Sequence, residues 1–260
     1  MTRLALIIEY DGTRYSGFQY QANAPSVQAE LEAAAGALTG ESVRIAGSGR
    51  TDAGVHAAGQ VIAFDSGSTL SPGQFLSGMN HHLPQDIVVR SAQSVPEGFD
   101  PRRDAASRWY RYSLLRRQHR SPLADRTAVV VGREIDLGRM RGAAWLMVGV
   151  HDFARLAGRL DDPAASTVRE VSRVDVRTEG ERISIDVEGN AFLPHQVRRM
   201  VGVMVDAGTG KIAPHEVEDL LSGEGQAPQA RTMPPQGLCL MRVRYPEELG
   251  LKVPADTITE

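Results

Sequence analysis

Apolar and polar positions follow one another along the first hundred residues in runs that predict a regular order of strands and helices. Two stretches repeat apolar residues at helical spacing, one between the cap residue Ser26 and Gly40, the other from Ser71 and Pro72. Runs with the character of strands occur at residues 3–10, 42–48, 59–65 and 86–95. The predicted order is therefore strand, helix, strand, strand, helix, strand.

The following residues repeat this order in longer form. Helices are expected from about Asp136, from Pro194 and, as a short element, from Pro214. Strands are expected at residues 107–115, 167–180, 182–189 and 237–245, the middle two as a hairpin around Glu179-Gly180. The predicted fold class is α+β, with two ferredoxin-like β-α-β-β-α-β halves like those of RNA-recognition domains.

This pattern predicts a mixed, largely antiparallel sheet with helices on one face and a central binding cleft. We expect an N-terminal half over 1–105, a C-terminal half over 106–246 and a polar, partly disordered tail over 247–260. RNA-recognition folds stack bases on sheet aromatics, and Tyr110 and Tyr112 lie beside arginine at the required spacing. Aromatics at this spacing are more often core residues, so the pattern by itself favours neither role.

Composition narrows the class of protein. The chain has 260 residues, a net charge of −3 and one cysteine, Cys239. One cysteine allows neither an intramolecular disulfide nor a thiolate metal cluster, and no run of 18 apolar residues marks a membrane span, so a cytoplasmic protein is expected. Seven arginines against one aspartate lie between Arg102 and Arg120. Such a segment either contacts phosphate or is a solvated surface, and charge alone does not decide.

The stretch GSGRTDAGVHAAGQVIAF, residues 47–64, places Arg50 and Asp52 among glycines between two predicted strands. It lacks the third glycine of a dinucleotide fingerprint, and GTGKI at 208–212 lacks the first glycine and the hydroxyl residue of a phosphate-binding loop. The histidines show neither metal-ligand spacing nor a catalytic triad. Aspartate beside glycine often bonds its own backbone, but a carboxylate in so permissive a loop, with Arg50 beside it, also suits catalysis or ligand binding.

The run GRTDAGVHAAGQV, residues 49–61, resembles the motif of the tRNA pseudouridine synthase A family that carries the catalytic aspartate. Further stretches resemble the same family in the same order: 10–21, 99–112, 151–156, 189–202 and 237–245. The resemblance implies an isomerase that converts uridine to pseudouridine at positions 38 to 40 of the tRNA anticodon arm. It also implies a homodimer that uses no cofactor and no metal.

The resemblance assigns roles to five residues. Asp52 matches the catalytic aspartate, Arg50 the arginine that helps to flip the target base, and Tyr110 the tyrosine that stacks on that base and acts as a general base. Arg198 matches the arginine that pairs with the aspartate, and Leu238 a pocket leucine. The residues alone do not choose Arg198 over its neighbour, because adjacent helix residues point about 100° apart.

The sequence departs from the family pattern at several positions. Phe18 stands where tryptophan is usual, Pro101 where alanine is common, and Pro194, Gln196 and Arg199 where a histidine-rich run is frequent. None of these changes touches the residues with assigned roles. They bear on details of RNA contact and on the start of the helix near Pro194.

The chemistry needs an ionised carboxylate, which a neighbouring arginine favours. The aspartate attacks C1′ of the ribose or C6 of the ring, or acts as a base at C2′, and the sequence leaves these routes open. Extruding the base costs a few kcal/mol, of which stacking on Tyr110 returns about 1–3 kcal/mol. Two alternatives remain: a noncatalytic RNA-binding protein, for which Asp52 is dispensable, and a small-molecule hydrolase, which usually needs a second acid.

Overall fold

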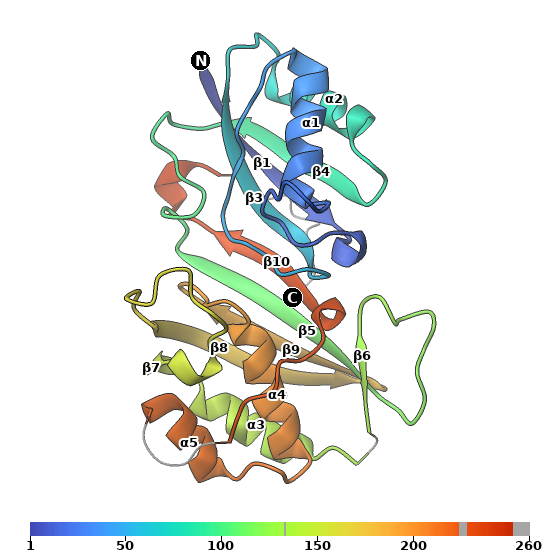
Figure 1. The fold of residues 1–260 in the computed structure, drawn as a ribbon, viewed down its shortest axis with the longest axis vertical. Coiled ribbons are helices and arrows are strands. Elements are labelled where there is room, and N and C mark those ends of the chain that lie inside the picture. Colours follow the sequence, from blue (N-terminus) through green and yellow to red (C-terminus); the bar gives the residue numbers. More distant parts are fainter. Residues whose placement is uncertain (133, 224–227, 252–260) are drawn as a thin grey trace. The chain divides into compact units, whose positions relative to one another are not determined.

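The computed structural model describes residues 1–132, 134–223 and 228–251, which form two compact units (Figure 1). The first unit is Met1–Arg108 together with the segment from Cys239 onward, and the second is Trp109–Leu238. The first boundary thus lies close to the expected one at 105. The last strand was expected in the C-terminal half, but its residues from Cys239 onward belong to the first unit. Of the expected tail, Glu247–Leu249 form a 3₁₀ turn, and residues 252–260 lie outside the described residues.

The first unit has the expected order of elements. Two of its strands, β1 (Thr2–Tyr10) and β3 (His56–Ser66), pair antiparallel along their whole length. On the other side of β1 lies β4 (Ile87–Ser94), also antiparallel, whereas β10 (Leu238–Arg244) pairs with β3 in parallel. The strand order in this unit is β4-β1-β3-β10, so its sheet is mixed and largely antiparallel, as predicted.

Both helices of the first unit begin at the predicted caps. The Ser26 hydroxyl accepts a hydrogen bond from the Ala29 amide, and α1 (Val27–Thr39) ends at Gly40, whose φ of 73° is left-handed. The helix α2 (Pro72–His82) opens with a capping box between Ser71 and Gln74. In Figure 1 these two helices lie side by side over the strands, and the two elements are in contact with each other.

The strand predicted at 42–48 is much shorter in the structure. Only β2 (Ala46–Gly47) forms, antiparallel to β3. The reason lies in α1: Glu32 Oε1 accepts the Ile45 amide at 3.0 Å, and Gln28 Nε2 donates to the Ile45 carbonyl at 3.1 Å. Because helix side chains take the backbone groups that a strand would use, no longer ladder forms there.

Apart from the last strand, the second unit contains the predicted elements, together with two short strands that were not expected. The predicted ones are β5 (Ser107–Arg116), which begins in the last residues of the first unit, α3 (Leu137–Leu146), β8 (Val168–Glu179), β9 (Arg182–Gly189), α4 (Gln196–Gly208) and α5 (Pro214–Ser222). The additional strands are β6 (Val129–Val131) and β7 (Gly149–Asp152). The strand order is β5-β9-β8-β7, with β6 parallel to β5. The fold is α+β in both units, as predicted.

Helix α4 begins two residues later than predicted. Pro194 lies outside it, and His195 is the N-cap residue with a left-handed φ of 60°. The side chain of Gln196 turns back and accepts the Leu193 amide at 2.8 Å, which fixes the chain before the helix. The helix then packs against α3, which also contacts α5 and β8. Among the described residues no helix is both long and apolar enough to cross a membrane.

Candidate functional site

Asp52 lies half-buried in the loop that joins β2 to β3, and hydrogen bonds fasten the start of this loop. The fully buried Gln60 of β3 accepts the Ser48 hydroxyl at 2.6 Å through Oε1 and donates from Nε2 to the Gly49 carbonyl at 2.9 Å. The Ser48 amide donates to the Val61 carbonyl at 2.8 Å. Three hydrogen bonds therefore hold the chain just before Arg50 and Asp52.

The residue before Asp52 is fixed from two sides. The hydroxyls of Tyr10 and Thr51 lie 2.8 Å apart in a hydrogen bond, and the Phe18 amide donates to the Thr51 carbonyl at 3.1 Å. Gly17 makes this approach possible: its φ is 108°, and a β-carbon there would lie 2.7 Å from the Thr51 carbonyl oxygen. The backbone at Asp52 is thus set by the segment that contains Gly17 and Phe18.

Phe18, which stands where the resemblance leads one to expect tryptophan, is a packing residue. Its side chain is buried, its ring lies 6.5 Å from that of Tyr10, and a β-carbon on Gly47 would lie 2.5 Å from the ring. Glycine at 47 therefore lets the ring lie against β2. The change from tryptophan leaves the loop supported by an aromatic ring.

His56, at the end of the loop, also holds structure together. His56 Nδ1 lies 3.1 Å from the Gly12 amide nitrogen and 3.1 Å from Asp11 Oδ1. A β-carbon on Gly12 would lie 2.0 Å from the Val55 carbonyl oxygen, which shows how closely the two segments approach. His56 thus connects the end of the loop to the segment that contains Asp11 and Gly12.

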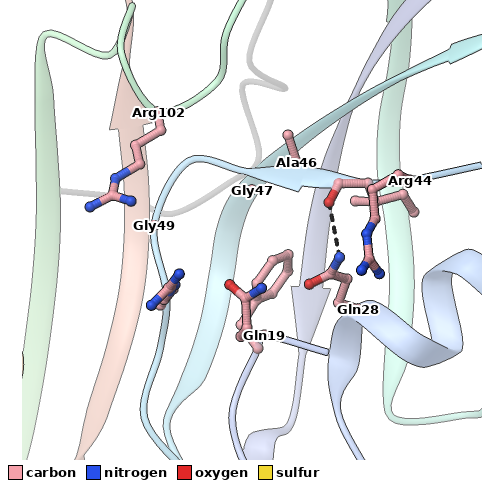
Figure 2. A pocket seen from close by; sticks show the side chains of 10 residues that line it. Gln19, Gln28, Arg44, Ala46, Gly47, Gly49 and Arg102 are labelled. Carbon is pink, nitrogen blue, oxygen red and sulfur yellow. Dashed lines mark hydrogen bonds between the residues drawn. The ribbon is translucent and has the colours of Figure 1, made fainter. Parts of the chain in front are cut away.

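A hollow of about 260 Å³ opens beside the loop. Figure 2 shows Arg102 and Arg44 on its two sides, with Gln19 between them. Arg50, predicted as a substrate-binding residue, is exposed and also lines the hollow. The complete lining is Phe18, Gln19, Gln28, Arg44, Ile45, Ala46, Gly47, Gly49, Arg50 and Arg102. Three guanidinium groups give this hollow a basic character.

The second unit holds Tyr110, on β5. Its side chain is only 8% exposed, and its ring meets that of Phe192 edge to face at 5.4 Å between centroids. Two residues further on, the Tyr112 hydroxyl donates to the Pro234 carbonyl at 2.7 Å. Burial raises the pKa of Tyr112 well above its ordinary value, against the smaller opposing effect of Arg198. Tyr112 is therefore a neutral core residue at physiological pH.

The segment 233–238 contacts two elements of the second unit, α4 through Arg198 and β5 through Tyr112. Arg198 Nε donates to the Met233 carbonyl at 2.7 Å, and the Met233 amide donates back to the Arg198 carbonyl at 3.3 Å. Gly237 lies against Tyr112, because a β-carbon there would be 2.5 Å from the ring. The buried Leu238 follows directly. Among the predicted residues of this unit, Arg198 and Leu238 are thus linked through one short segment.

Arg199 contacts other partners than its neighbour does. Its Nε donates to the Thr232 hydroxyl at 3.1 Å, and its Nη1 donates to the Ala157 carbonyl. The two adjacent arginines therefore differ in orientation, as the helical geometry predicts. Asp52 and Arg50 belong to the first unit, and Tyr110, Arg198 and Leu238 to the second; their shared roles stay predictions.

The arginine-rich segment from 102 to 120 is largely occupied with internal contacts. The buried Arg108 donates to the carbonyls of Ser48, Arg102 and Ala105. Arg111 binds the fully buried Asp186 through two hydrogen bonds of 2.8 and 3.0 Å. Arg108 and Arg111 are thus structural residues of this segment. Arg102, which is exposed and lines the hollow, differs from them.

Three supporting residues escaped prediction from the sequence: Gln60, Arg108 and Tyr10. Gln60 left one signal, since it is a polar residue within a run of strand residues that are otherwise mostly apolar. The sequence contains no signal for the role of Arg108, because it is one of seven arginines between residues 102 and 120. In the part of the chain that the structure describes, no group of three or more His, Cys, Asp or Glu residues is placed to hold a metal ion.

A half-buried carboxylate on a fastened loop, next to a basic hollow, is an arrangement that suits an enzyme acting on an anionic substrate. Residues 6–102 and 143–246 match the family model described as tRNA pseudouridine synthase. The chain therefore belongs to the tRNA pseudouridine synthase family.

Relatives in three bacteria, each named tRNA pseudouridine synthase A, agree with this family. The protein of Geobacter sulfurreducens is 44% identical over 247 residues, which cover 94% of this chain and 100% of the relative. That of Geotalea uraniireducens is 45% identical over 246 residues, with 94% and 100% covered. That of Myxococcus xanthus is 42% identical over 258 residues, with 99% and 97% covered. The similarity thus extends over nearly the whole of both chains.

Proposed function

We propose that this chain isomerises uridine to pseudouridine at positions 38 to 40 of the tRNA anticodon arm. One observation carries the proposal: the family match begins at residue 6 and runs through the fastened loop that holds Asp52. Relatives more than 40% identical over nearly their full length bear the name of this activity. A cytoplasmic location and a homodimer belong to the same proposal.

The reaction breaks the bond between C1′ and N1, turns the uracil, and joins C5 to C1′. C5 then loses its proton and N1 gains one, so the product is an isomer and no co-reactant is required. Asp52 serves as the nucleophile at C1′ or C6, or as the base at C2′. Each route requires the ionised carboxylate.

The other residues carry roles that support this chemistry. Arg50, exposed beside Asp52, occupies the place that the flipped base vacates, and Tyr110 stacks on that base. Stacking on one aromatic ring returns about 1–3 kcal/mol of the cost of extrusion. Arg198 keeps the aspartate ionised, and Leu238 packs against the substrate. Arg198 contacts Met233 at the start of the short segment that ends at Leu238.

The test is to incubate the protein with an unmodified tRNA transcript and to map pseudouridine by chemical derivatisation. We expect modification at positions 38 to 40 with the native chain and none with Asp52→Asn, while tRNA binding stays unchanged. Glu218→Gln, an equivalent change at an exposed carboxylate on α5, is the matched control and keeps full activity. Binding without any modification by the native chain would favour a noncatalytic RNA-binding protein instead.

A further inference from the structure

The basic hollow beside the Asp52 loop has the features of a binding site for an anion. Three of its lining side chains are arginines, and two, Gln19 and Gln28, are neutral amides. No carboxylate lines it. Arginine presents its donors in a planar fork that matches phosphate oxygens, so a hollow of this composition suits a phosphate group.

Contacts with neighbouring residues orient Arg44. Its guanidinium lies 3.2 Å from Glu32 Oε2 and 5.3 Å from the centre of the Tyr20 ring, over its face. Glu32 in turn accepts the Ile45 amide and the Gln28 amide, so the carboxylate is fixed by the backbone next to Arg44. An arginine held in this way loses less freedom when it binds an anion.

Arg102 stands on the other side of the hollow on a short turn. Its backbone amide donates to Asp100 Oδ1 at 2.9 Å, and its carbonyl accepts the buried Arg108 at 2.5 Å. Arg103, which follows Arg102, donates through its Nε to Asp100 Oδ2 at 3.0 Å. The turn is thus fixed while the Arg102 side chain stays exposed at the hollow.

The hollow lies within one nucleotide's reach of the proposed catalytic residue. Gly49 and Arg50 line it, and the Cα atoms of Arg50 and Asp52 are at most about 7 Å apart, because two residues span no more than this. A group bound in the hollow is therefore close to a nucleotide bound at Asp52. In a nucleic acid chain, that group is a backbone phosphate.

We propose that the hollow between Arg44 and Arg102 is a subsite for the backbone phosphate of a nucleotide next to the target uridine. The proposal rests on the proposed function, since it assumes an RNA strand at Asp52. It adds a contact to RNA that none of the five residues with assigned roles provides. It fixes the strand on one side of the target while the base is extruded.

The test measures affinity and not turnover, so it stays separate from the test of the catalytic role. Anticodon-arm RNAs are prepared with a single neutral methylphosphonate at each backbone position around the target. One such change is expected to weaken binding to the native chain by about tenfold, because a charge-assisted hydrogen bond is lost. The same RNA is expected to bind Arg102→Gln and Arg44→Gln with no further loss.

Arg120→Gln is the matched control. It removes an exposed arginine that neither lines the hollow nor contacts the turn of Arg102, and it keeps the full sensitivity to the methylphosphonate. Loss of one phosphate contact also lowers the slope of log affinity against log salt by about 0.7–0.9 in the hollow variants. Melting temperatures of all variants verify that the fold is unchanged.

Two results would overturn the subsite. In one, no methylphosphonate couples to Arg44 or Arg102 although the native chain forms pseudouridine, which leaves the proposed function standing. In the other, inorganic phosphate or uridine monophosphate displaces RNA from the native chain but not from the variants, and no methylphosphonate has an effect. The hollow then binds a free phosphate compound and not the RNA backbone.

Discussion

The amide side chain of Gln60 is hydrogen-bonded to the Ser48 hydroxyl at 2.6 Å, across the base of the loop that carries Asp52. The same amide donates to the Gly49 carbonyl, and it is fully buried. One side chain on β3 therefore holds both the side chain of Ser48 and the backbone of the next residue. We infer that Gln60 is a positioning residue for the Asp52 loop.

Replacing Gln60 by leucine is expected to lower kcat by about tenfold or more, since small displacements of a catalytic group are costly. The affinity for tRNA is expected to stay within about twofold, because the Gln60 side chain is fully buried and presents no atom to the RNA. The free energy of unfolding falls by about 1–3 kcal/mol, because a buried hydroxyl and a buried carbonyl lose their partner. Single-turnover kinetics and tRNA titration separate the two effects.

A double variant serves as the control for Gln60. Ser48→Ala in the Gln60→Leu background removes the hydroxyl that Gln60→Leu leaves without its partner. The double variant is therefore expected to lose less free energy of unfolding than the two single variants lose together. Simple additivity would show that the hydrogen bond between them contributes nothing.

Gly17→Ala is expected to disturb the Asp52 loop from the opposite side. A β-carbon there would lie 2.7 Å from the Thr51 carbonyl oxygen, and the φ of 108° disfavours alanine as well. We expect kcat to fall by at least about tenfold and the melting temperature to drop by several degrees. Gly73→Ala in α2, where a β-carbon meets nothing within 4 Å, is the control and is neutral or slightly stabilising. Equal effects of both changes would contradict this account.

Because of Asp86, the stability of the first unit is expected to vary with pH in the acidic range. Burial acts to raise the pKa of its carboxyl, but hydrogen bonds from Arg14 and Tyr15, at 2.6 and 2.8 Å, outweigh it and hold the pKa below its ordinary value. A depressed folded pKa means that the contribution is complete above the unfolded pKa of about 3.9 and is lost as the pH falls through the folded pKa.

Asp86→Asn is therefore expected to lower the melting temperature at pH 7 by about 3 °C. Below about pH 4 the difference from the native chain shrinks, because the carboxyl then takes up a proton in the unfolded state, and it is fully lost only when the pH falls below the depressed pKa of the folded state. Thermal unfolding followed by circular dichroism at several pH values measures this. The exposed Asp162, replaced by asparagine, is the control for the same change of side chain. A difference that stays constant with pH would contradict the role of the charge.

Tyr110 is expected to act through its ring. Tyr110→Leu weakens binding of the anticodon arm by about 1–3 kcal/mol, the value of stacking one base on an aromatic side chain. Tyr110→Phe keeps the ring and binds as the native chain does, so any fall in its kcat reports on the hydroxyl as a general base. Titration of both variants with the same RNA tests this, and equal affinities for them would exclude stacking.

Local patterns predicted most helices and strands because their signals lie within a few residues. Ser26 and Gly40 bound α1, and Ser71 with Gln74 caps α2, through contacts that a sequence displays directly. The strand predicted around Ile45 is shorter than expected because of residues more distant in the sequence. Glu32 and Gln28 of α1 bind the backbone of Ile45. Such competition cannot be read from alternation alone.

The supports of the candidate site were less predictable than its central residue. Asp52 was singled out by its glycine-rich loop and by family resemblance, whereas Gln60 and Arg108 act through contacts that only the fold creates. Arg108 lies 60 residues from its acceptor Ser48, and β10 pairs with β3 over a still longer separation. Pairing between distant segments depends on the whole chain, so no local pattern indicates it.

The most direct test of the central claim is pseudouridine formation by Asp52→Asn on an unmodified tRNA transcript, measured together with its affinity for that tRNA. We expect the affinity to remain within about twofold and the rate to fall by at least about 10⁴-fold, the scale of losing a nucleophile. A variant that retains a rate within about tenfold of the native chain would contradict the assignment of Asp52.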